Sequence, residues 1–394
     1  MPHIRIGEFD PSIFPFRHGD VEFLWYAGNL EHANEGLIGV EVADVPFLLQ
    51  VKREADSALI KAEKISRPSP NTLIKKALQA YLDRVGPPLI YANIAGIERA
   101  KLQKPHPCLK EIDTFDSDRL PHKPLWVEVG FGSGRHLIHQ AKNRPDVHLI
   151  GLEIHRPSLE QVMRRIDLEH LDNVWVIDYD ARLFLELLPS NRVQRIFVHF
   201  PVPWDKKPHR RVISDAFVAE ASRVLEPGGT LELRTDSENY FHYAMEVFTR
   251  PRKVRLSLEK NADAAVKSKY EERWLRLRKD IYEIRFESLE RSPCKQKIGA
   301  FDFCSHDLAI SELFKRKPSK AHVAEGYFVH LERFYAIDER RGLVRVSLGS
   351  FDRPEHKYLF LSDEGANYYP HKPVATGTNL KAHHALKEWL CATS

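Results

Sequence analysis

The chain has few cysteines and no long hydrophobic run. Its 394 residues include four cysteines whose spacing matches neither a disulfide framework nor a zinc site: Cys108, Cys294, Cys304 and Cys391. No stretch approaches the roughly 18 uninterrupted apolar residues of a membrane span, and the N-terminus lacks the basic and apolar regions of a signal peptide. We therefore expect a globular, cytoplasmic protein with no structural disulfide, no bound metal and no membrane association.

The chain also lacks a strong net charge. Its 59 lysines and arginines against 55 acids give a formal net charge of +4, which by itself indicates no anionic partner. The cations are nevertheless clustered in "WDKKPHRR" (204–211), "RPRKVR" (250–255) and "RWLRLRK" (273–279). Such clusters contact phosphates in nucleic-acid-binding proteins, although charge runs are also common on solvated helices and loops. For the second and third clusters both interpretations stay open.

Repeats and low-complexity tracts are absent from the sequence, but its pattern changes twice. Residues 1–110 contain strand-like runs and one amphipathic helix over 71–85. Residues 111–290 alternate strands and helices, and residues 291–394 return to long strands before a final helix over 379–390. We interpret these as three domains: an N-terminal β-rich extension with a helix, a central domain, and a C-terminal β-rich accessory domain.

The central region predicts an α/β fold. Strands over "LWVEVG", "HLIGLEI", "NVWVID", "RIFVHF" and "TLELRT" alternate with helices from Leu125 onward. Such alternation is typical of a Rossmann-like, doubly wound, mostly parallel sheet with helices on both faces. Two later strands, "VRLSLEK" and "DIYEIRFE", would complete the sheet as an antiparallel pair.

Three glycines follow the first of these strands, in "EVGFGSG": Gly130, Gly132 and Gly134. Glycine permits a sharp turn and a close approach of backbone to ligand, and the next helix would present free N–H groups. The spacing G-x-G-x-G, directly after the acid Glu128, differs from the G-x-G-x-x-G of dinucleotide-binding proteins. A carboxylate there would repel a pyrophosphate but attract the ammonium and sulfonium groups of S-adenosylmethionine. The pattern therefore favours S-adenosylmethionine over a nicotinamide dinucleotide.

Two further acids follow the next two strands. Glu153, in "GLEIH", stands where nucleotide-binding α/β folds place a carboxylate to accept the ribose hydroxyls. Asp180, in "DYDA", is placed to accept from an adenine amino group, and the N–H of Ala181 to meet a ring nitrogen. Each acid has an ordinary alternative, because either could cap the helix that follows it. The ordered set of three carboxylates favours the cofactor site.

The loop after the fourth strand, "FPVPWDKKPHRR", makes the pattern specific. Together with "EVGFGSG", "GLEIH", "DYDA", "LRTDSENY" and "SKYEERW", in this order, it resembles the bacterial tRNA (guanine-N(7)-)-methyltransferase family, a class I S-adenosylmethionine-dependent family. The resemblance covers about residues 125–287 and implies methylation of guanine N7 in tRNA, at position 46 of the variable loop. It also implies that Glu128, Glu153 and Asp180 hold the cofactor. The residues that it implies for tRNA contact are Lys206, Asp236, Ser268, Lys269, Tyr270 and Glu271.

The same loop carries an aromatic residue and cations suited to a nucleic acid. Trp204 could stack on a flipped-out base, while Arg210 and Arg211 would contact phosphates. We favour a monomer, although the sequence does not determine the oligomeric state.

The chain departs from the family at one position. The family reads F-P-D-P-W with a catalytic aspartate, whereas this chain has Val202 there. Guanine N7 has an in-plane lone pair and no proton, so in-line attack on a sulfonium methyl depends mainly on alignment. We therefore expect an active enzyme in which Asp205 or Asp236 substitutes for the missing carboxylate. The alternatives are a methyltransferase-like RNA-binding module without catalysis and, against the glycine spacing, a nicotinamide-dependent oxidoreductase.

Overall fold

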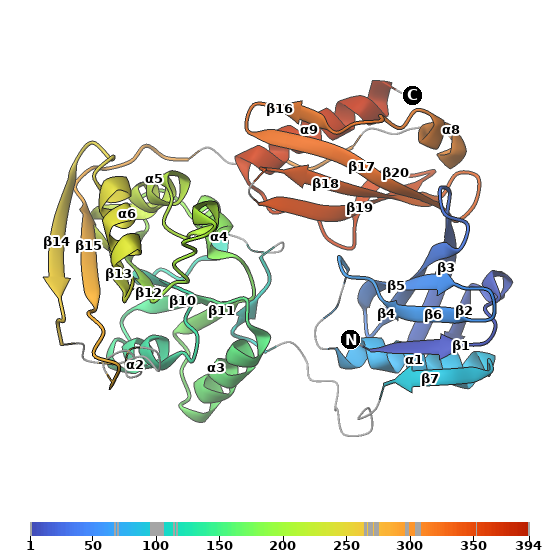
Figure 1. Cartoon of the computed structure of the whole chain (residues 1–394), viewed down its shortest axis with the longest axis horizontal. Helices are drawn as coiled ribbons and strands as arrows, with labels where there is room; N and C mark the ends of the chain where they lie inside the picture. The colour runs from blue at the N-terminus through green and yellow to red at the C-terminus, as the bar shows by residue number, and fades with distance from the viewer. Residues whose placement is uncertain are drawn as a thin grey trace. The chain divides into compact units, whose positions relative to one another are not determined.

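The chain divides into two compact units, Pro105–Lys297 and a unit that joins Met1–Lys104 to Ile298–Ser394. The computed structural model describes residues 2–66, 68, 71–94, 106–112, 115, 117–263, 266, 271, 276–295, 299–303, 309–351 and 353–392. Figure 1 labels most of the elements of both units. Within these ranges no helix has the length and apolar character needed to cross a membrane.

The unit Pro105–Lys297, called here the central unit, contains an eight-stranded sheet in the order β14-β15-β13-β12-β9-β10-β11-β8. Strands β8 to β13 pair in parallel, while β15 pairs antiparallel with both β13 and β14. The prediction of a mostly parallel sheet that ends in an antiparallel pair is therefore confirmed. The strands are β8 (Leu109–Lys110), β9 (Leu125–Val129), β10 (His148–Leu152), β11 (Val174–Ile177), β12 (Val193–His199), β13 (Leu225–Thr235), β14 (Val254–Lys260) and β15 (Tyr282–Ser288).

Helices cover both faces of this sheet. On one face, α2 (Arg135–Asn143) and α3 (Arg156–Leu168) pack on a core that includes Trp126, Leu149 and Phe197. On the other face, α6 (Glu238–Phe248) contacts β13 and β15, and its Phe248 ring lies 5.6 Å from that of Phe286. The structure also describes α4 (Ala181–Leu187) and α5 (Asp215–Val224) in this unit. Because both faces are covered, the loops at the strand ends are the natural place for a site.

The second unit, called here the flanking unit, contains one antiparallel sheet in the order β20-β19-β18-β17-β3-β4-β5-β6-β1-β7, with β2 and β16 paired beside β3 and β17. Its N-terminal strands are β1 (His3–Ile6), β2 (Phe16–His18), β3 (Val21–Asn29), β4 (Glu35–Val42), β5 (Val45–Arg53), β6 (Ala58–Ala62) and β7 (Leu89–Asn93). Its C-terminal strands are β16 (His322–Ala324), β17 (Tyr327–Ala336), β18 (Gly342–Gly349), β19 (Pro354–Ser362) and β20 (Gly365–Tyr369).

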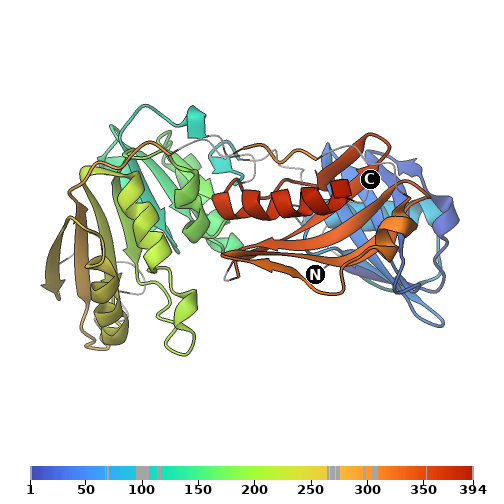
Figure 2. The ribbon, with the colours of Figure 1, turned by 90° about the horizontal axis from the view of Figure 1, so that it is seen from above.

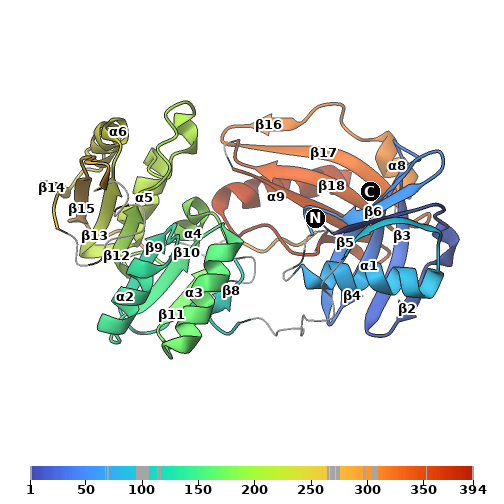
Figure 3. The same cartoon turned by 60° about the horizontal axis from the view of Figure 1, so that its bottom comes forward.

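One helix packs on each half of this sheet, on the same side. Helix α1 (Thr72–Val85) lies against the N-terminal half (Figure 3), and α9 (Gly377–Ala392) lies along the C-terminal half (Figure 2). The short helix α8 (Ile310–Lys315) precedes β16. On the opposite side of the sheet, Trp25, Leu48, Tyr335 and Tyr358 form a smaller core that draws on both halves.

The two halves repeat one order of elements. A short strand, four long antiparallel strands and a helix follow each other as β2-β3-β4-β5-β6-α1 and again as β16-β17-β18-β19-β20-α9. Both first long strands carry an irregularity in register, between Phe23 and Trp25 in β3 and between Leu331 and Arg333 in β17. The repeat is one of topology, because the residues at matched positions differ.

Two expectations change here. We expected the two flanks as separate domains, whereas β17 pairs with β3 through Tyr335–Asn29 and Ala336–Gly28, so that both flanks share one sheet. Sequence patterns do not show a pairing between strands some 300 residues apart. We also expected no disulfide, but Cys391 is disulfide-bonded, so that prediction is wrong. Cysteine spacing gave no sign of it, because a disulfide depends on which cysteines the fold brings within bonding distance.

Candidate active site

Two predicted segments follow neighbouring strands in the middle of the central unit's sheet and leave it at the same end of those strands. Strands β9 and β12 are parallel neighbours, with Val129 opposite Val198. The chain continues from β9 to β10 on one side of β9, whereas β12 lies on the other side, so the strand order reverses here. The glycine turn after β9 and the loop after β12 therefore leave the sheet at the position where open α/β sheets bind ligands.

The glycine turn has a conformation that other residues rarely adopt. Gly130 and Gly134 have φ of 70° and 66°, and Gly132 has φ of 54°. A Cβ at Gly134 would lie 2.2 Å from Cγ2 of Val162, so this glycine lets the turn pack on α3. A Cβ at Gly130 would meet no atom within 4 Å, so the protein leaves open space beside that residue. The first two glycines thus keep the turn open, and the third closes it against the protein.

Glu153 fixes the glycine turn to the end of β10. One carboxylate oxygen accepts from the N–H of Gly132 at 2.9 Å, and the other accepts from the N–H groups of Ile154 and His155, each at 2.9 Å. The next side chain, Ile154, is 72% exposed. A carboxylate offers about four lone-pair sites, so three N–H donors leave Glu153 able to accept one more hydrogen bond.

Asp180 has the capping role that the sequence left open. Its side chain accepts from the N–H of Arg182 at 3.0 Å as the N-cap of α4, which begins at the buried Ala181, and it also pairs with the Arg182 guanidinium. Asp178, the first acid of "DYDA", was not among the predicted site residues; it lies 3.1 Å from Arg156. Burial raises the pKa of the Asp178 carboxyl, Arg156 opposes this shift, and the charge of Glu153 adds to it. Asp178 therefore lies close to Glu153 and belongs to the same candidate site.

Glu128 lies inside the protein, behind the glycine turn. Its side chain is buried and contacts Nδ1 of His136 in α2 at 2.8 Å, while Nε2 of that ring lies 3.0 Å from the Gln140 amide. Burial alone would lower the pKa of His136, but the charge and hydrogen bond of Glu128 outweigh it, so the pKa is raised. His136 therefore has a partner within the protein, and among the described residues no cluster suited to a metal ion exists.

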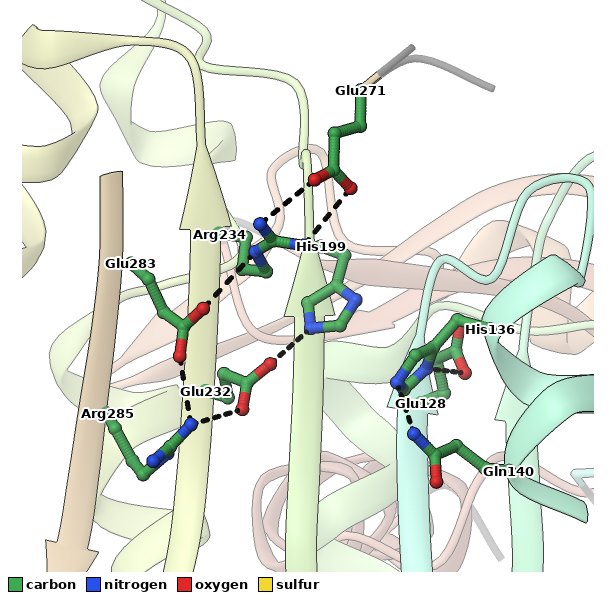
Figure 4. Close-up of polar contacts among 9 residues, drawn as sticks. All are labelled: Glu128, His136, Gln140, His199, Glu232, Arg234, Glu271, Glu283 and Arg285. Atoms are coloured by element: carbon green, nitrogen blue, oxygen red, sulfur yellow. Dashed lines mark hydrogen bonds and ion pairs between the residues drawn. The ribbon is translucent and has the colours of Figure 1, made fainter. Parts of the chain in front are cut away.

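A chain of polar contacts crosses the neighbouring strands (Figure 4). His199, the last residue of β12, lies 2.9 Å from Glu232, and its ring centroid lies 4.7 Å from that of His136. Arg285 joins Glu232 to Glu283, at 3.3 Å and 3.0 Å. Arg234 then joins Glu283 at 3.3 Å to Glu271 at 3.0 Å.

This chain of contacts gives its members definite charge states. Burial lowers the pKa of His199, so that near neutral pH the ring is uncharged and donates to Glu232. Burial would raise the pKa of Glu232, but His199 and Arg285 outweigh it and lower the pKa to about 2. The carboxylate of Glu271, which we expected to contact tRNA, is buried against Arg234. The neighbouring residues that were also predicted to contact tRNA, Ser268, Lys269 and Tyr270, lie outside the described residues.

The loop after β12 presents two exposed apolar residues. Val202 is 59% exposed and Trp204 is 37% exposed, and the Arg210 guanidinium lies 5.2 Å from the Trp204 ring centroid. Phe200 and Trp204 have φ of 51° and 47°, which is costly for residues with large side chains. The surrounding structure must therefore hold this loop in place.

Arg211 is the residue that holds it. Its guanidinium is buried, donates from Nε to the carbonyl of Pro203 at 2.7 Å and contacts Asp205 at 3.2 Å. The same group lies 4.5 Å from the Tyr243 ring centroid. We predicted Arg211 as a phosphate contact, but its donors face the protein, so we now assign it to the loop's conformation.

The two acids predicted to replace the family aspartate also have partners within the protein. Asp205 is bound to Arg211 as described, and Asp236, just after β13, contacts Lys279 at 2.7 Å. Lys206, Lys207 and Arg210 remain exposed, as expected for residues that contact phosphates.

Comparison with known proteins also indicates a methyltransferase, and the relatives match nearly the whole chain. A family model described as "Putative methyltransferase" matches residues 122–284. The tRNA (guanine-N(7)-)-methyltransferase of Wolinella succinogenes is 41% identical over 393 residues, which cover 99% of this chain and 100% of that protein. Proteins of the same name from Campylobacter fetus subsp. fetus and Helicobacter pylori are each 38% identical, and cover 100% and 99% of this chain and 100% and 98% of their own lengths. The similarity therefore includes both flanks and is not limited to the central unit.

Proposed function

The chain belongs to the tRNA (guanine-N(7)-)-methyltransferase family, and from this premise we propose that it transfers a methyl group from S-adenosylmethionine to N7 of a guanine in tRNA. The proposal includes position 46 of the variable loop as the target and a monomeric enzyme in the cytoplasm, where tRNA is modified. The observation that carries it is the near full-length identity of 41% to a relative of that name, together with the glycine turn and Glu153 at the switch point of the sheet.

The residues at the edge of the sheet fit the proposed cofactor. The open space beside Gly130 gives the cofactor room next to the backbone, and Glu153 keeps one lone-pair site for a ribose hydroxyl. Ile154 offers an exposed apolar surface beside Glu153. Glu128 is buried and paired with His136. We therefore assign it the role of positioning the glycine turn, without direct contact with the ammonium group. When bound, S-adenosylmethionine supplies an electrophilic methyl group.

The loop after β12 would orient the guanine. Trp204 presents an exposed ring face, and Arg211 holds the loop that carries it. Guanine N7 needs no base to become a nucleophile, so positioning supplies the main contribution even though Val202 replaces the family aspartate. Lys206, Lys207 and Arg210 would contact phosphates near the target.

The test is tritiated methyl transfer from S-adenosylmethionine to an unmodified tRNA transcript, followed by chain cleavage at N7-methylguanine. We expect incorporation of about one methyl group per tRNA and cleavage at position 46, and a transcript with that guanine replaced by adenine should accept none. If the protein binds both cofactor and tRNA but transfers no methyl group, the alternative of a non-catalytic RNA-binding module is correct. Binding of NAD in place of S-adenosylmethionine would indicate an oxidoreductase.

A further inference from the structure

Arg234, near the carboxyl end of β13, lies beside the start of the loop after β12. The residue is buried, and the parallel register places it opposite His199, the last residue of β12. Its carbonyl oxygen accepts from the N–H of Phe200, the first residue of the loop, at 2.7 Å. Phe200 has φ of 51°, a conformation that costs free energy for a residue with a large side chain. The backbone of Arg234 therefore helps to hold the loop where that cost arises.

The side chain of Arg234 contacts Phe200 as well, together with Glu271. The guanidinium lies 5.8 Å from the Phe200 ring centroid, within the range of a cation–π contact. Its two terminal nitrogens donate to the Glu271 carboxylate at 3.1 Å and 3.0 Å, and Nε lies 3.3 Å from Glu283 (Figure 4). A bidentate pair fixes the orientation of a guanidinium as well as its distance. One buried side chain thus connects Glu271 to the first residue of the loop.

This arrangement contributes little that the fold requires for its stability. Burial raises the pKa of the Glu283 carboxyl, and the charge of Glu232 adds to the shift, while Arg234 and Arg285 oppose it without cancelling it. Buried ion pairs lose about as much hydration free energy as they gain in attraction, and apolar residues of similar volume are often as stabilising. Apolar residues could not reproduce the fixed geometry between Glu271, Arg234 and Phe200. The cluster therefore indicates a positional role.

A second arginine of the same network provides a comparison. Arg285, on β15, binds the same Glu283 at 3.0 Å and binds Glu232 on β13 at 3.3 Å. Its side chain is 44% exposed, whereas that of Arg234 is 5% exposed. In the described part of the chain, the ion pairs of Arg285 stay within the sheet. Arg285 therefore shares the charge network with Arg234 but not the contact with the loop.

We propose that Arg234 is a positioning residue for methyl transfer, which holds Phe200 and with it the loop that carries Trp204. Glu271 then acts by orienting Arg234 and does not bind tRNA itself. The effect on methyl transfer rests on the proposed function, whereas the dependence of the loop on Arg234 follows from the contacts above. Because the loop presents guanine to the methyl group, loss of these contacts misaligns the two reactants and lowers kcat more than it alters tRNA affinity.

The first test compares kcat and the KM for tRNA in full-length variants. A misplacement of about 1 Å can cost about 100-fold in rate, so Arg234→Met should lower kcat by about that factor. Arg234→Lys keeps the charge and loses the bidentate geometry, so it should lower kcat by at least about ten-fold. The control Arg285→Met, which breaks partly exposed ion pairs, should change kcat by less than about two-fold. Glu271→Gln should lower kcat and leave the KM for tRNA unchanged.

The double variant of Arg234→Met with Glu271→Gln separates the two possible roles of Glu271. If Glu271 acts through Arg234, the double variant should be as slow as Arg234→Met alone, because the interaction is already lost. If the effects of the two changes multiply, or if Glu271→Gln raises the KM for tRNA, Glu271 contacts tRNA and the proposal is wrong. Arg234→Met leaves the Glu271 carboxylate buried without the guanidinium; should this variant fail to fold in urea titrations, Arg234→Lys takes its place in the comparison.

A second measurement reports on the loop without any methyl transfer. Trypsin can cleave after the exposed Lys206, and the rate of this cleavage in the folded protein, followed by mass spectrometry, measures how firmly the loop is held. We expect cleavage to be at least about five-fold faster in Arg234→Lys than in the wild type and unchanged in Arg285→Met.

The two measurements distinguish failure of this proposal from failure of the proposed function. If the wild type methylates tRNA and Arg234→Lys changes neither kcat nor cleavage, the positioning role is wrong and the proposed function stands. If the wild type does not methylate tRNA but Arg234→Lys is cleaved faster, the proposed function fails and Arg234 still holds the loop. A weaker tRNA affinity in Arg234→Lys with unchanged kcat would assign the residue to tRNA binding and overturn the proposal.

Discussion

The two sheets of this chain differ in which surfaces are accessible for binding: the strand ends in one and an open face in the other. In the central unit, helices cover both faces, so the glycine turn, Glu153 and the loop after β12 all lie where strands end. In the flanking unit, α1 and α9 cover the same face, so the opposite face can carry exposed side chains such as Phe351. Parallel strands require crossover helices, whereas antiparallel strands can be joined by short turns that leave one face open. Changes at the carboxyl ends of the first sheet's strands should therefore alter catalysis, and changes on the open face of the second should leave the chemical step intact.

The largest effect should come from Glu153→Ala at the edge. This change removes the acceptor of three backbone N–H groups and the remaining lone-pair site for the cofactor. Loss of the one charge-assisted hydrogen bond to the cofactor, together with loss of the anchor of the glycine turn, should weaken S-adenosylmethionine binding by at least about 100-fold. Calorimetric titration measures this directly, with the exposed Glu160→Ala on α3 as control. Unchanged cofactor affinity in Glu153→Ala would show that the edge of this sheet is not the binding site.

Arg211→Ala should lower kcat by about 100-fold, because the guanine-orienting loop would lose its bond to the Pro203 carbonyl and its packing on Tyr243. Arg211→Lys should not restore the rate, since an ammonium lacks the planar guanidinium that reaches both partners. The exposed neighbour Arg210 provides the contrast: Arg210→Ala should raise KM and leave kcat unchanged. If Arg211→Ala raised only KM, Arg211 would be a phosphate contact as first predicted.

Glu128→Gln should destabilise the protein by an amount that depends on pH. The folded-state pKa of His136 is raised above its ordinary value of 6.5. The ion pair therefore stabilises the fold fully below pH 6.5, and this contribution disappears as pH rises through the raised pKa. We expect a loss of about 2 kcal/mol in the free energy of unfolding at pH 5.5 and a smaller loss at pH 9. Urea denaturation at both values measures it, and a loss that was larger at pH 9 would contradict this account. Glu160→Gln is the control.

The smallest effect should be that of Val202→Asp. The N7 lone pair needs no base, so a carboxylate at this exposed position would only stabilise the cationic product. We expect kcat to rise by less than about ten-fold, measured at saturating tRNA and cofactor. A much larger increase would show that the loop lacks a working group and that alignment alone is insufficient. Val202→Asn, which is similar in size and uncharged, separates charge from shape.

The sequence predicted those parts of the molecule that depend on local pattern. Alternation of strands and helices from Leu125 onward gave the sheet, and glycine spacing gave the turn, because both follow from the conformational preferences of neighbouring residues. It could not predict that His136 pairs with Glu128, since this contact depends on how α2 packs against β9. It also placed Arg211 with the exposed cations of its cluster, because the tyrosines that cover it lie about 30 residues later, in α6.

The flanking unit was harder to predict for a related reason. The longest strands and the helices α1 and α9 were expected, but the strand pairing between β17 and β3 that joins the two halves was not. Periodicity identifies strands and cannot identify partners so distant along the chain. The repeated order of elements was missed because matched positions such as Glu22 and Phe328 share a place in the sheet and no chemical property.

The junction between β17 and β3 also has a consequence for synthesis on the ribosome. The whole of the central unit is inserted between the two halves of the flanking unit, so nearly 300 residues emerge after β3 before its partner does. During that interval the edge of β3 that β17 will cover has no partner, and an open strand edge invites pairing with other chains. A nascent chain that stalls within the central unit would therefore carry, near its N-terminus, a half-sheet with an unpaired strand edge. Completion of this protein closes that edge with the last quarter of its own length.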